Sequence, residues 1–135
     1  MKNNATLTVT SLLSTVLFAS HWADEVSRGM EPGTISAFGG IVILVVLLSG
    51  PLVLGERRSG YIIMLLGGIF GLGVLVLHMT GKGMVGGRIP VNSPGVYFWV
   101  WTLIVLGSTS TISGILAARG LWRTFRSRSH LTESN

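Results

Sequence analysis

Long runs of apolar residues alternate with short polar segments along this chain of 135 residues. Four stretches are mainly apolar: residues 5 to 23, 35 to 54, 61 to 80 and 96 to 118. An α-helix needs about 20 such residues to cross the hydrocarbon core of a bilayer. The pattern therefore predicts an all-α fold, a transmembrane up-down four-helix bundle followed by a basic tail over residues 119 to 135.

The composition agrees with a membrane location. Hydrophobic residues make up 48% of the chain and charged residues 11%, whereas soluble domains average about 25% charged residues. The polar connections are too short to bury a core of their own, so we expect one integral membrane domain over residues 1 to 135. Cysteine is absent, which excludes thiolate metal sites, iron–sulfur clusters and a cysteine nucleophile.

The basic residues predict the orientation, because short loops rich in Lys and Arg stay on the cytoplasmic side of a membrane. If the chain crosses four times, seven of its ten basic residues share one side: Lys2, Arg57, Arg58, Arg119, Arg123, Arg126 and Arg128. Both termini are therefore expected to be cytoplasmic, with residues 24 to 34 and 81 to 95 outside. The partners expected are the bilayer, anionic lipid headgroups around the tail, and another copy or a larger membrane complex, but no nucleic acid.

The first span is the most polar, and two interpretations of it stay open. Its hydroxyl residues are Thr6, Thr8, Thr10, Ser11, Ser14, Thr15 and Ser20. With Lys2 ahead of a modest apolar core, it also has features of a signal peptide cleaved near Ala19. We favour retention, because hydroxyl groups can bond to the preceding helical turn or to a neighbouring helix.

Small residues in the third and fourth spans indicate close helix packing. Gly67 and Gly71 form a GxxxG pair, which suits packing inside the bundle better than a dimer face or a groove for a flat cofactor. Residues 107 to 114 combine glycine with small hydroxyl residues, which permit tight packing or line a polar pathway. The aromatic residues that open the fourth span are typical of an interfacial belt: Tyr97, Phe98, Trp99 and Trp101.

Ionisable residues gather at the outer ends of the first and third spans. His21, Asp24, Glu25 and Arg28 follow one another at helical spacing, and His78 ends the third span, which runs in the same direction. His21, Asp24, Glu25 and His78 could together hold a transition metal. Alternatively, the two histidines are the axial ligands of a haem, or the group relays protons for a solute. In the structural interpretation, a carboxylate pairs with Arg28 and His78 caps its helix.

Three segments carry a resemblance to known proteins: HWADEVSRGMEPG, GERRSGYIIMLLGG and LHMTGKGMVGGRI. They resemble a set of small bacterial membrane proteins with four spans, over almost the whole chain. The resemblance implies a four-span bundle in the bacterial cytoplasmic (inner) membrane. It implies no activity, substrate or ligand residue.

No motif of the sequence specifies a reaction, since neither a phosphate-binding loop nor a nucleophile elbow is present. The leading expectation is therefore a non-enzymatic accessory or structural membrane component. One alternative is a haem- or metal-binding membrane redox component that uses His21 and His78. The other is a small-solute transporter that uses the hydroxyl-rich fourth span.

Overall fold

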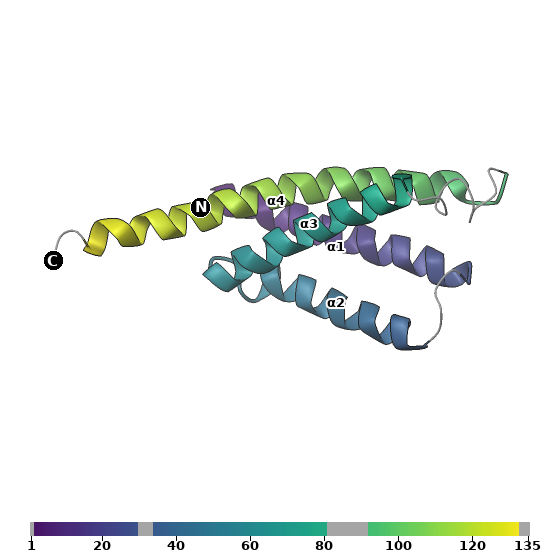
Figure 1. The fold of residues 1–135 in the computed structure, drawn as a ribbon, viewed down its shortest axis with the longest axis horizontal. Helices are drawn as coiled ribbons and strands as arrows, with labels where there is room; N and C mark the ends of the chain where they lie inside the picture. Colours follow the sequence, from purple (N-terminus) through teal and green to yellow (C-terminus); the bar gives the residue numbers. More distant parts are fainter. Residues whose placement is uncertain (1, 30–33, 81–91, 133–135) are drawn as a thin grey trace.

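The computed structural model describes residues 2 to 29, 34 to 80 and 92 to 132, and within them the chain is all-α. The four helices are α1 (Lys2–Ser27), α2 (Thr34–Leu52), α3 (Arg58–Thr80) and α4 (Val96–Thr132). Figure 1 shows α4, the longest, lying along α1 and α3 and continuing beyond them. Most of the expected outer loop, over residues 81 to 91, and the last three residues lie outside the described part.

Two of the helices are long and apolar enough to cross a membrane. They are α3 over Arg58–Met79 and α4 over Val96–Arg126. Where its side chains are described, α2 is apolar over Phe38–Leu52. The hydroxyl-rich α1 is not among the candidate spans of the described residues. Length and composition thus identify two candidate spans among the four described helices.

Glycine brings α3 and α4 into direct backbone contact. A Cβ atom placed on Gly68 would lie 2.7 Å from the Cα atom of Gly114, so no side chain separates the helices at this point. Gly71 faces Ser110 of α4, whereas Gly67 faces Leu47 of α2. The two glycines of the GxxxG pair therefore serve two different interfaces within the same bundle.

Helix α1 runs antiparallel to α4 and turns its hydroxyl face toward it. Successive contacts join Ser11 Oγ to Ser113 Oγ at 2.7 Å, Ser14 Oγ to Thr109 Oγ1 at 3.0 Å, and His21 Nδ1 to Thr102 Oγ1 at 3.2 Å. The apolar side chains of Phe18 and Leu106 are buried at the levels between these contacts. The hydroxyl groups of Ser11, Ser14 and Thr15 on α1 are thus covered by protein. Among the described residues, the hydroxyl contacts between α1 and α4 do not form a continuous polar path.

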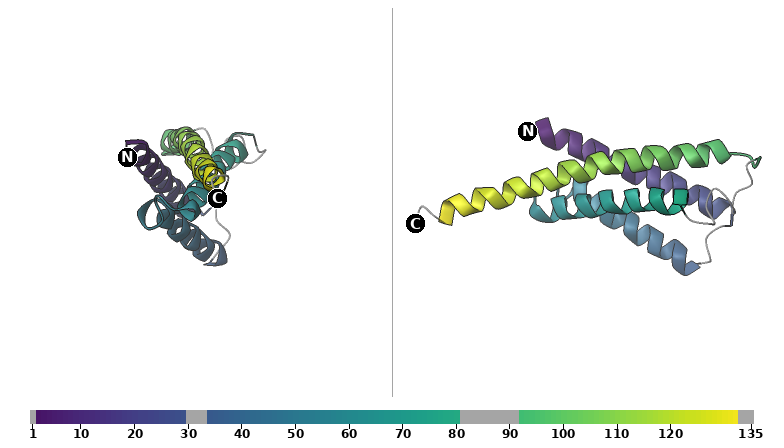
Figure 2. Two further views of the ribbon diagram at one scale, coloured as in Figure 1. Left: turned by 90° about the vertical axis from the view of Figure 1, so that its left-hand side faces the viewer. Right: turned by 45° about the horizontal axis from the view of Figure 1, so that its top comes forward.

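Helix α2 packs on the others near its C-terminal end and diverges from α1 toward its N-terminal end (Figures 1 and 2). The indole of Trp22 fills the space at Gly40, where a Cβ atom would collide with it. Helix α1 ends at Ser27, and Gly29 adopts a φ of 69°. Glycine tolerates this left-handed conformation, which allows the chain to leave the helix one turn after Glu25.

Candidate metal-binding site

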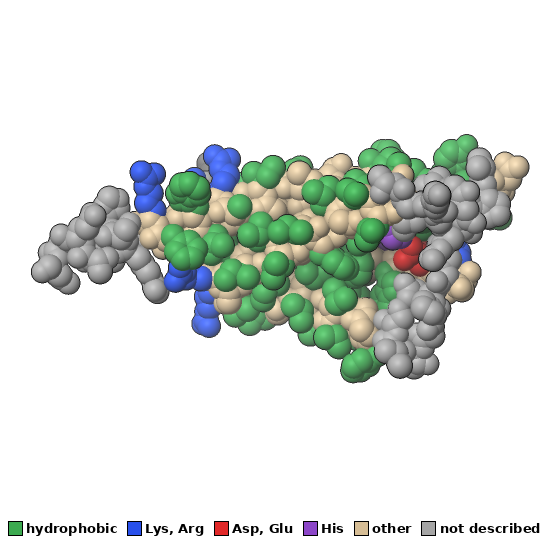
Figure 3. Space-filling view, in the orientation of Figure 1, with side chains coloured by type: hydrophobic (Ala, Val, Ile, Leu, Met, Phe, Trp, Pro, Cys, Tyr) green, Lys and Arg blue, Asp and Glu red, His purple; other side chains and the backbone are tan. Residues whose placement is uncertain are grey.

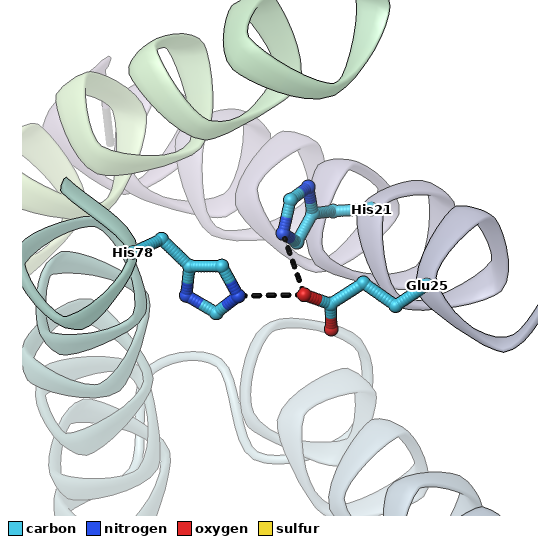
Figure 4. Close-up of side chains that lie close together, drawn as sticks. All are labelled: His21, Glu25 and His78. Carbon is cyan, nitrogen blue, oxygen red and sulfur yellow. Dashed lines mark hydrogen bonds and ion pairs between the residues drawn. The ribbon is translucent and has the colours of Figure 1, made fainter. Parts of the chain in front are cut away.

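His21, Glu25 and His78 converge at one end of the bundle, and we call them the His–Glu cluster. His21 and Glu25 lie one turn apart on α1, and His78 lies in the last turn of α3 (Figure 4). The Oε1 atom of Glu25 is 2.6 Å from Nε2 of His78 and 3.5 Å from Nε2 of His21. One ligand atom from each residue falls within 4.8 Å of the others. The helices therefore position two imidazoles around a single carboxylate oxygen.

Hydrogen bonding determines which nitrogen of His21 faces this oxygen. Thr102 Oγ1 lies 2.9 Å from the carbonyl oxygen of Trp99, to which it donates its only proton. It must therefore accept a proton from His21 Nδ1, at 3.2 Å. The Nε2 atom of His21 is left without a hydrogen-bond partner, although the residue is only 1% exposed. Its nearest polar neighbour in the cluster is Oε1 of Glu25, at 3.5 Å, and a cation placed between the two atoms would satisfy both.

His78 is oriented in the same way by its own helix. Its Nδ1 atom lies 2.8 Å from the carbonyl oxygen of Val74. A carbonyl oxygen only accepts, so Nδ1 carries the proton and Nε2 points to Glu25. Metal-binding histidines are typically held like this, with one nitrogen donating to a protein oxygen and the other on the metal.

The carboxylate of Glu25 lies beyond the expected first span, and its environment keeps it ionised. Burial alone would raise its pKa, but the contacts and charges of the two imidazoles outweigh burial and lower the pKa from its ordinary value of 4.5 to about 2. An ionised carboxylate is the form that binds a metal ion. Binding of a metal ion would displace the protons through which the imidazoles contact this carboxylate, and would leave one negative oxygen donor and two nitrogen donors.

Trp99 of α4 packs against both imidazoles of the His–Glu cluster. Its ring lies 5.2 Å from that of His21 and 5.4 Å from that of His78, and the residue is fully buried. Tyr97, Phe98 and Trp101 are exposed, so three of the four residues of the expected aromatic belt face outward and Trp99 faces the protein. The indole excludes water from one side of the two imidazoles.

The geometry suits a metal ion better than a haem. The imidazoles of His21 and His78 meet edge to face, with 5.1 Å between their centroids. Axial haem ligands must stand on opposite faces of a macrocycle, and rings in contact with each other leave no space for one.

In a tetrahedral metal site with bonds of about 2.0–2.2 Å, ligand atoms lie roughly 3.3–3.5 Å apart. The 3.5 Å from His21 Nε2 to Glu25 Oε1 fits this value. The shorter contact of His78 would open by less than about 1 Å, and the two histidine nitrogens lie within 4.8 Å of each other.

Asp24, the fourth residue of the expected metal group, has a different partner. Its Oδ2 atom accepts a hydrogen bond of 2.7 Å from Nε of Arg28. Arg28 also donates from Nη2 to the carbonyl oxygen of Pro94, at 3.1 Å, just before α4 begins. The Asp24–Arg28 pair therefore ties the end of α1 to the start of α4, and three protein ligands remain in the cluster.

Sequence reasoning did not identify Thr102 and Trp99 as parts of this site. The sequence does contain one indication, because Trp99 and Thr102 lie three residues apart and share a helix face with Leu106, Thr109 and Ser113, which packs on α1. Only the register of α4 against α1 brings that face to His21.

Comparisons with protein families, with curated proteins and with solved structures find no match to this chain.

Proposed function

We propose that this chain is a four-span integral membrane protein that binds a divalent transition-metal ion at the outer end of its bundle. The ligands are Nε2 of His21, Nε2 of His78 and Oε1 of Glu25. One observation carries the proposal: both imidazoles donate their Nδ1 protons elsewhere and turn Nε2 toward the same ionised oxygen.

The ligand set determines the class of metal. Two imidazoles and one carboxylate suit Zn²⁺, Co²⁺, Ni²⁺, Cu²⁺ and Fe²⁺, whereas Mg²⁺ and Ca²⁺ prefer oxygen ligands alone. Three protein ligands leave a coordination position for water or another small ligand. The site therefore resembles an exchangeable or reactive metal centre more than a closed structural one, which fits an accessory component of a membrane metal or redox system.

The distribution of apolar surface supports the membrane part of the proposal. Only 17% of the apolar window of α3 and 39% of that of α4 is buried, whereas the core helix of a soluble protein is mostly buried. Figure 3 shows hydrophobic side chains over the middle of the molecule, most of the Lys and Arg side chains near one end, and the histidine and acidic side chains toward the other. Such a division is typical of a membrane protein whose basic end is cytoplasmic.

A cobalt titration tests the metal site directly. The detergent-purified protein, stripped by a chelator, is titrated with Co²⁺ while the visible absorption of the bound ion is recorded. We expect one ion per chain and a loss of affinity of at least tenfold in each of His21→Ala, His78→Ala and Glu25→Gln.

Two matched controls decide whether the loss is specific. Asp24→Asn removes the neighbouring carboxylate, which contacts Arg28 instead, and His130→Ala removes the third histidine of the chain. Both variants should bind Co²⁺ as the unaltered protein does. If Asp24→Asn weakens binding as much as Glu25→Gln, or if either cluster histidine is dispensable, the proposed ligand set is wrong.

The absence of cysteine allows a clean test of the four crossings. Single cysteines at Ser27, Ser59 and Asn92, all exposed, are treated with a membrane-impermeant maleimide in sealed vesicles. We expect Ser27→Cys and Asn92→Cys to react from the outer side and Ser59→Cys only from the cytoplasmic side. Reaction of Ser59→Cys and Asn92→Cys from the same side would mean that α3 does not cross.

A further inference from the structure

A second recognition surface lies at the opposite end of the bundle, on the last part of α4. Arg119 and Arg123 lie one helical turn apart, with the indole of Trp122 beside them. Together with Ala118 they line a shallow hollow on the surface of the helix. Arg119 and Arg123 are exposed, and Trp122 has a relative exposure of 70%. The hollow therefore presents an exposed indole beside two guanidinium groups.

The packing of α4 fixes the level of this hollow relative to the apolar belt. Gly120 lies under the ring of Tyr61, so this turn of α4 is beside the first turn of α3. The candidate membrane span of α3 begins there, at Arg58. The guanidinium carbon of Arg58 lies 4.0 Å from the centroid of the Phe125 ring, which holds the two helices together at the same level.

The charge around the hollow is strongly positive. Basic residues whose side chains are described at this end include Arg57, Arg58, Arg119, Arg123 and Arg126, and Figure 3 shows basic side chains gathered there on both sides of α4. The acidic residue in the same region is Glu56, whereas Asp24 and Glu25 lie at the other end. An anion is therefore attracted to this surface.

We infer that the hollow between Arg119 and Arg123 binds the phosphate of an anionic phospholipid from the cytoplasmic leaflet. Two guanidinium groups one turn apart can donate to phosphate oxygens from both sides. Trp122 then lies in the headgroup region, where indole rings are enriched. A nucleic acid or a soluble acidic partner would not require aromatic side chains at the level where the apolar belt begins. The inference rests on the proposed membrane location and not on the metal site.

Native mass spectrometry of retained lipid tests the inference. The protein is equilibrated in mixed micelles with equal amounts of phosphatidylglycerol and phosphatidylcholine, and the lipids that remain bound are counted. We expect phosphatidylglycerol to be enriched on the unaltered protein. A basic residue near a membrane surface contributes about 1 kcal/mol, or roughly fivefold in binding, so R119Q/R123Q should reduce the enrichment at least tenfold.

Two further variants distinguish a specific phosphate-binding site from general electrostatic attraction between the basic end of the bundle and anionic lipids. Arg57→Gln removes a charge from the same end without touching the hollow, and it should keep most of the enrichment. Trp122→Ala leaves the charge unchanged, and it should reduce retention several-fold. An equal loss in Arg57→Gln and Arg119→Gln, or no preference for phosphatidylglycerol in the unaltered protein, would overturn the inference. If the cysteine labelling shows that α3 does not cross the membrane, the proposed membrane location is wrong. If α3 crosses but the protein shows no preference for phosphatidylglycerol, only the lipid site is wrong.

Discussion

The hydroxyl of Thr102 on α4 accepts the Nδ1 proton of His21 on α1, over 3.2 Å. This contact joins the first helix to the last and determines that Nε2 of His21 faces Glu25. The orientation of the first proposed ligand is therefore decided by a residue 81 positions away in the chain.

Replacing Thr102 by Val should weaken metal binding without removing a ligand. Valine has nearly the same shape as threonine but cannot accept the Nδ1 proton, so the imidazole loses the bond that fixes its tautomer. Removal of such supporting bonds typically lowers metal affinity by about 10–100-fold. The affinity for Co²⁺ or Zn²⁺ is measured by calorimetric titration in detergent.

Thr109→Val is the matched control for this substitution. Thr109 accepts a hydrogen bond from Ser14 on the same helix interface and bonds its own backbone, but it does not contact the His–Glu cluster. Removal of the Thr109 hydroxyl group should leave the affinity for metal within about twofold of that of the unaltered protein. Equal weakening by the two valine substitutions would mean that general loosening of the helix interface explains both.

The ionisation of Glu25 should make the metal-free protein sensitive to acid. Because the folded pKa of about 2 lies below the ordinary 4.5, the folded state favours the ionised carboxylate. This stability is complete above about pH 4.5 and is lost as the pH falls toward 2. The difference between the two pKa values corresponds to roughly 3 kcal/mol.

The variant Glu25→Gln isolates the contribution of the ionised carboxylate to folding stability, because glutamine resembles the protonated acid at every pH. Thermal unfolding in detergent should show the variant clearly less stable at pH 5, with the difference shrinking as the pH is lowered to 3. A stability difference that stays constant over this range would show that the ionised carboxylate does not stabilise the fold.

Gly68→Ala should destabilise the bundle, because the added methyl group meets backbone atoms that cannot rotate away. The built Cβ atom lies 2.7 Å from the Cα and 2.8 Å from the nitrogen of Gly114. Overpacking of this kind costs about 1–3 kcal/mol. Gly73 lies on the same helix with open space around it, and Gly73→Ala should be neutral or stabilising by up to about 1 kcal/mol. The stabilities of Gly68→Ala and Gly73→Ala are compared by following helicity during denaturation in mixed micelles. Equal changes in stability would contradict the backbone contact at Gly68.

The bond between Ser11 and Ser113 should contribute little energy despite its 2.7 Å length. A double-mutant cycle with Ser11→Ala, Ser113→Ala and the double variant measures the coupling, which we expect to be about 0.6 kcal/mol, the average for such bonds inside membranes. A coupling above about 2 kcal/mol would indicate that this contact, and not the glycine packing, dominates the stability of the interface.

Apolar periodicity predicted the existence and order of the helices but not all of their ends. The expected fourth span, over residues 96 to 118, is part of a helix that continues to Thr132. Hydropathy identifies where apolar side chains stop, and no proline follows to stop the helix itself. In contrast, Gly29 marks the end of α1, because its left-handed conformation is a local property that the sequence reveals.

The cluster could be predicted only in part, for a geometric reason. Helix direction places His21 and His78 at the same depth, and their rings lie 5.1 Å apart. The choice between Asp24 and Glu25 depends on the rotation of α1 about its axis, which Thr102 and the hydroxyl contacts with α4 determine. That rotation is a property of packing between segments about a hundred residues apart, and no local pattern contains it.

The hydroxyl face of α1 also has a consequence for biosynthesis. Among the four described helices α1 is made first, yet the partners of its Ser11 and Ser14 hydroxyl groups belong to α4, which is made last. If the chain spans the bilayer as proposed, the insertion machinery holds α1 without this partner until α4 has entered. We therefore expect the amino-terminal helix to acquire its final position late, as the closing step of assembly and not the opening one.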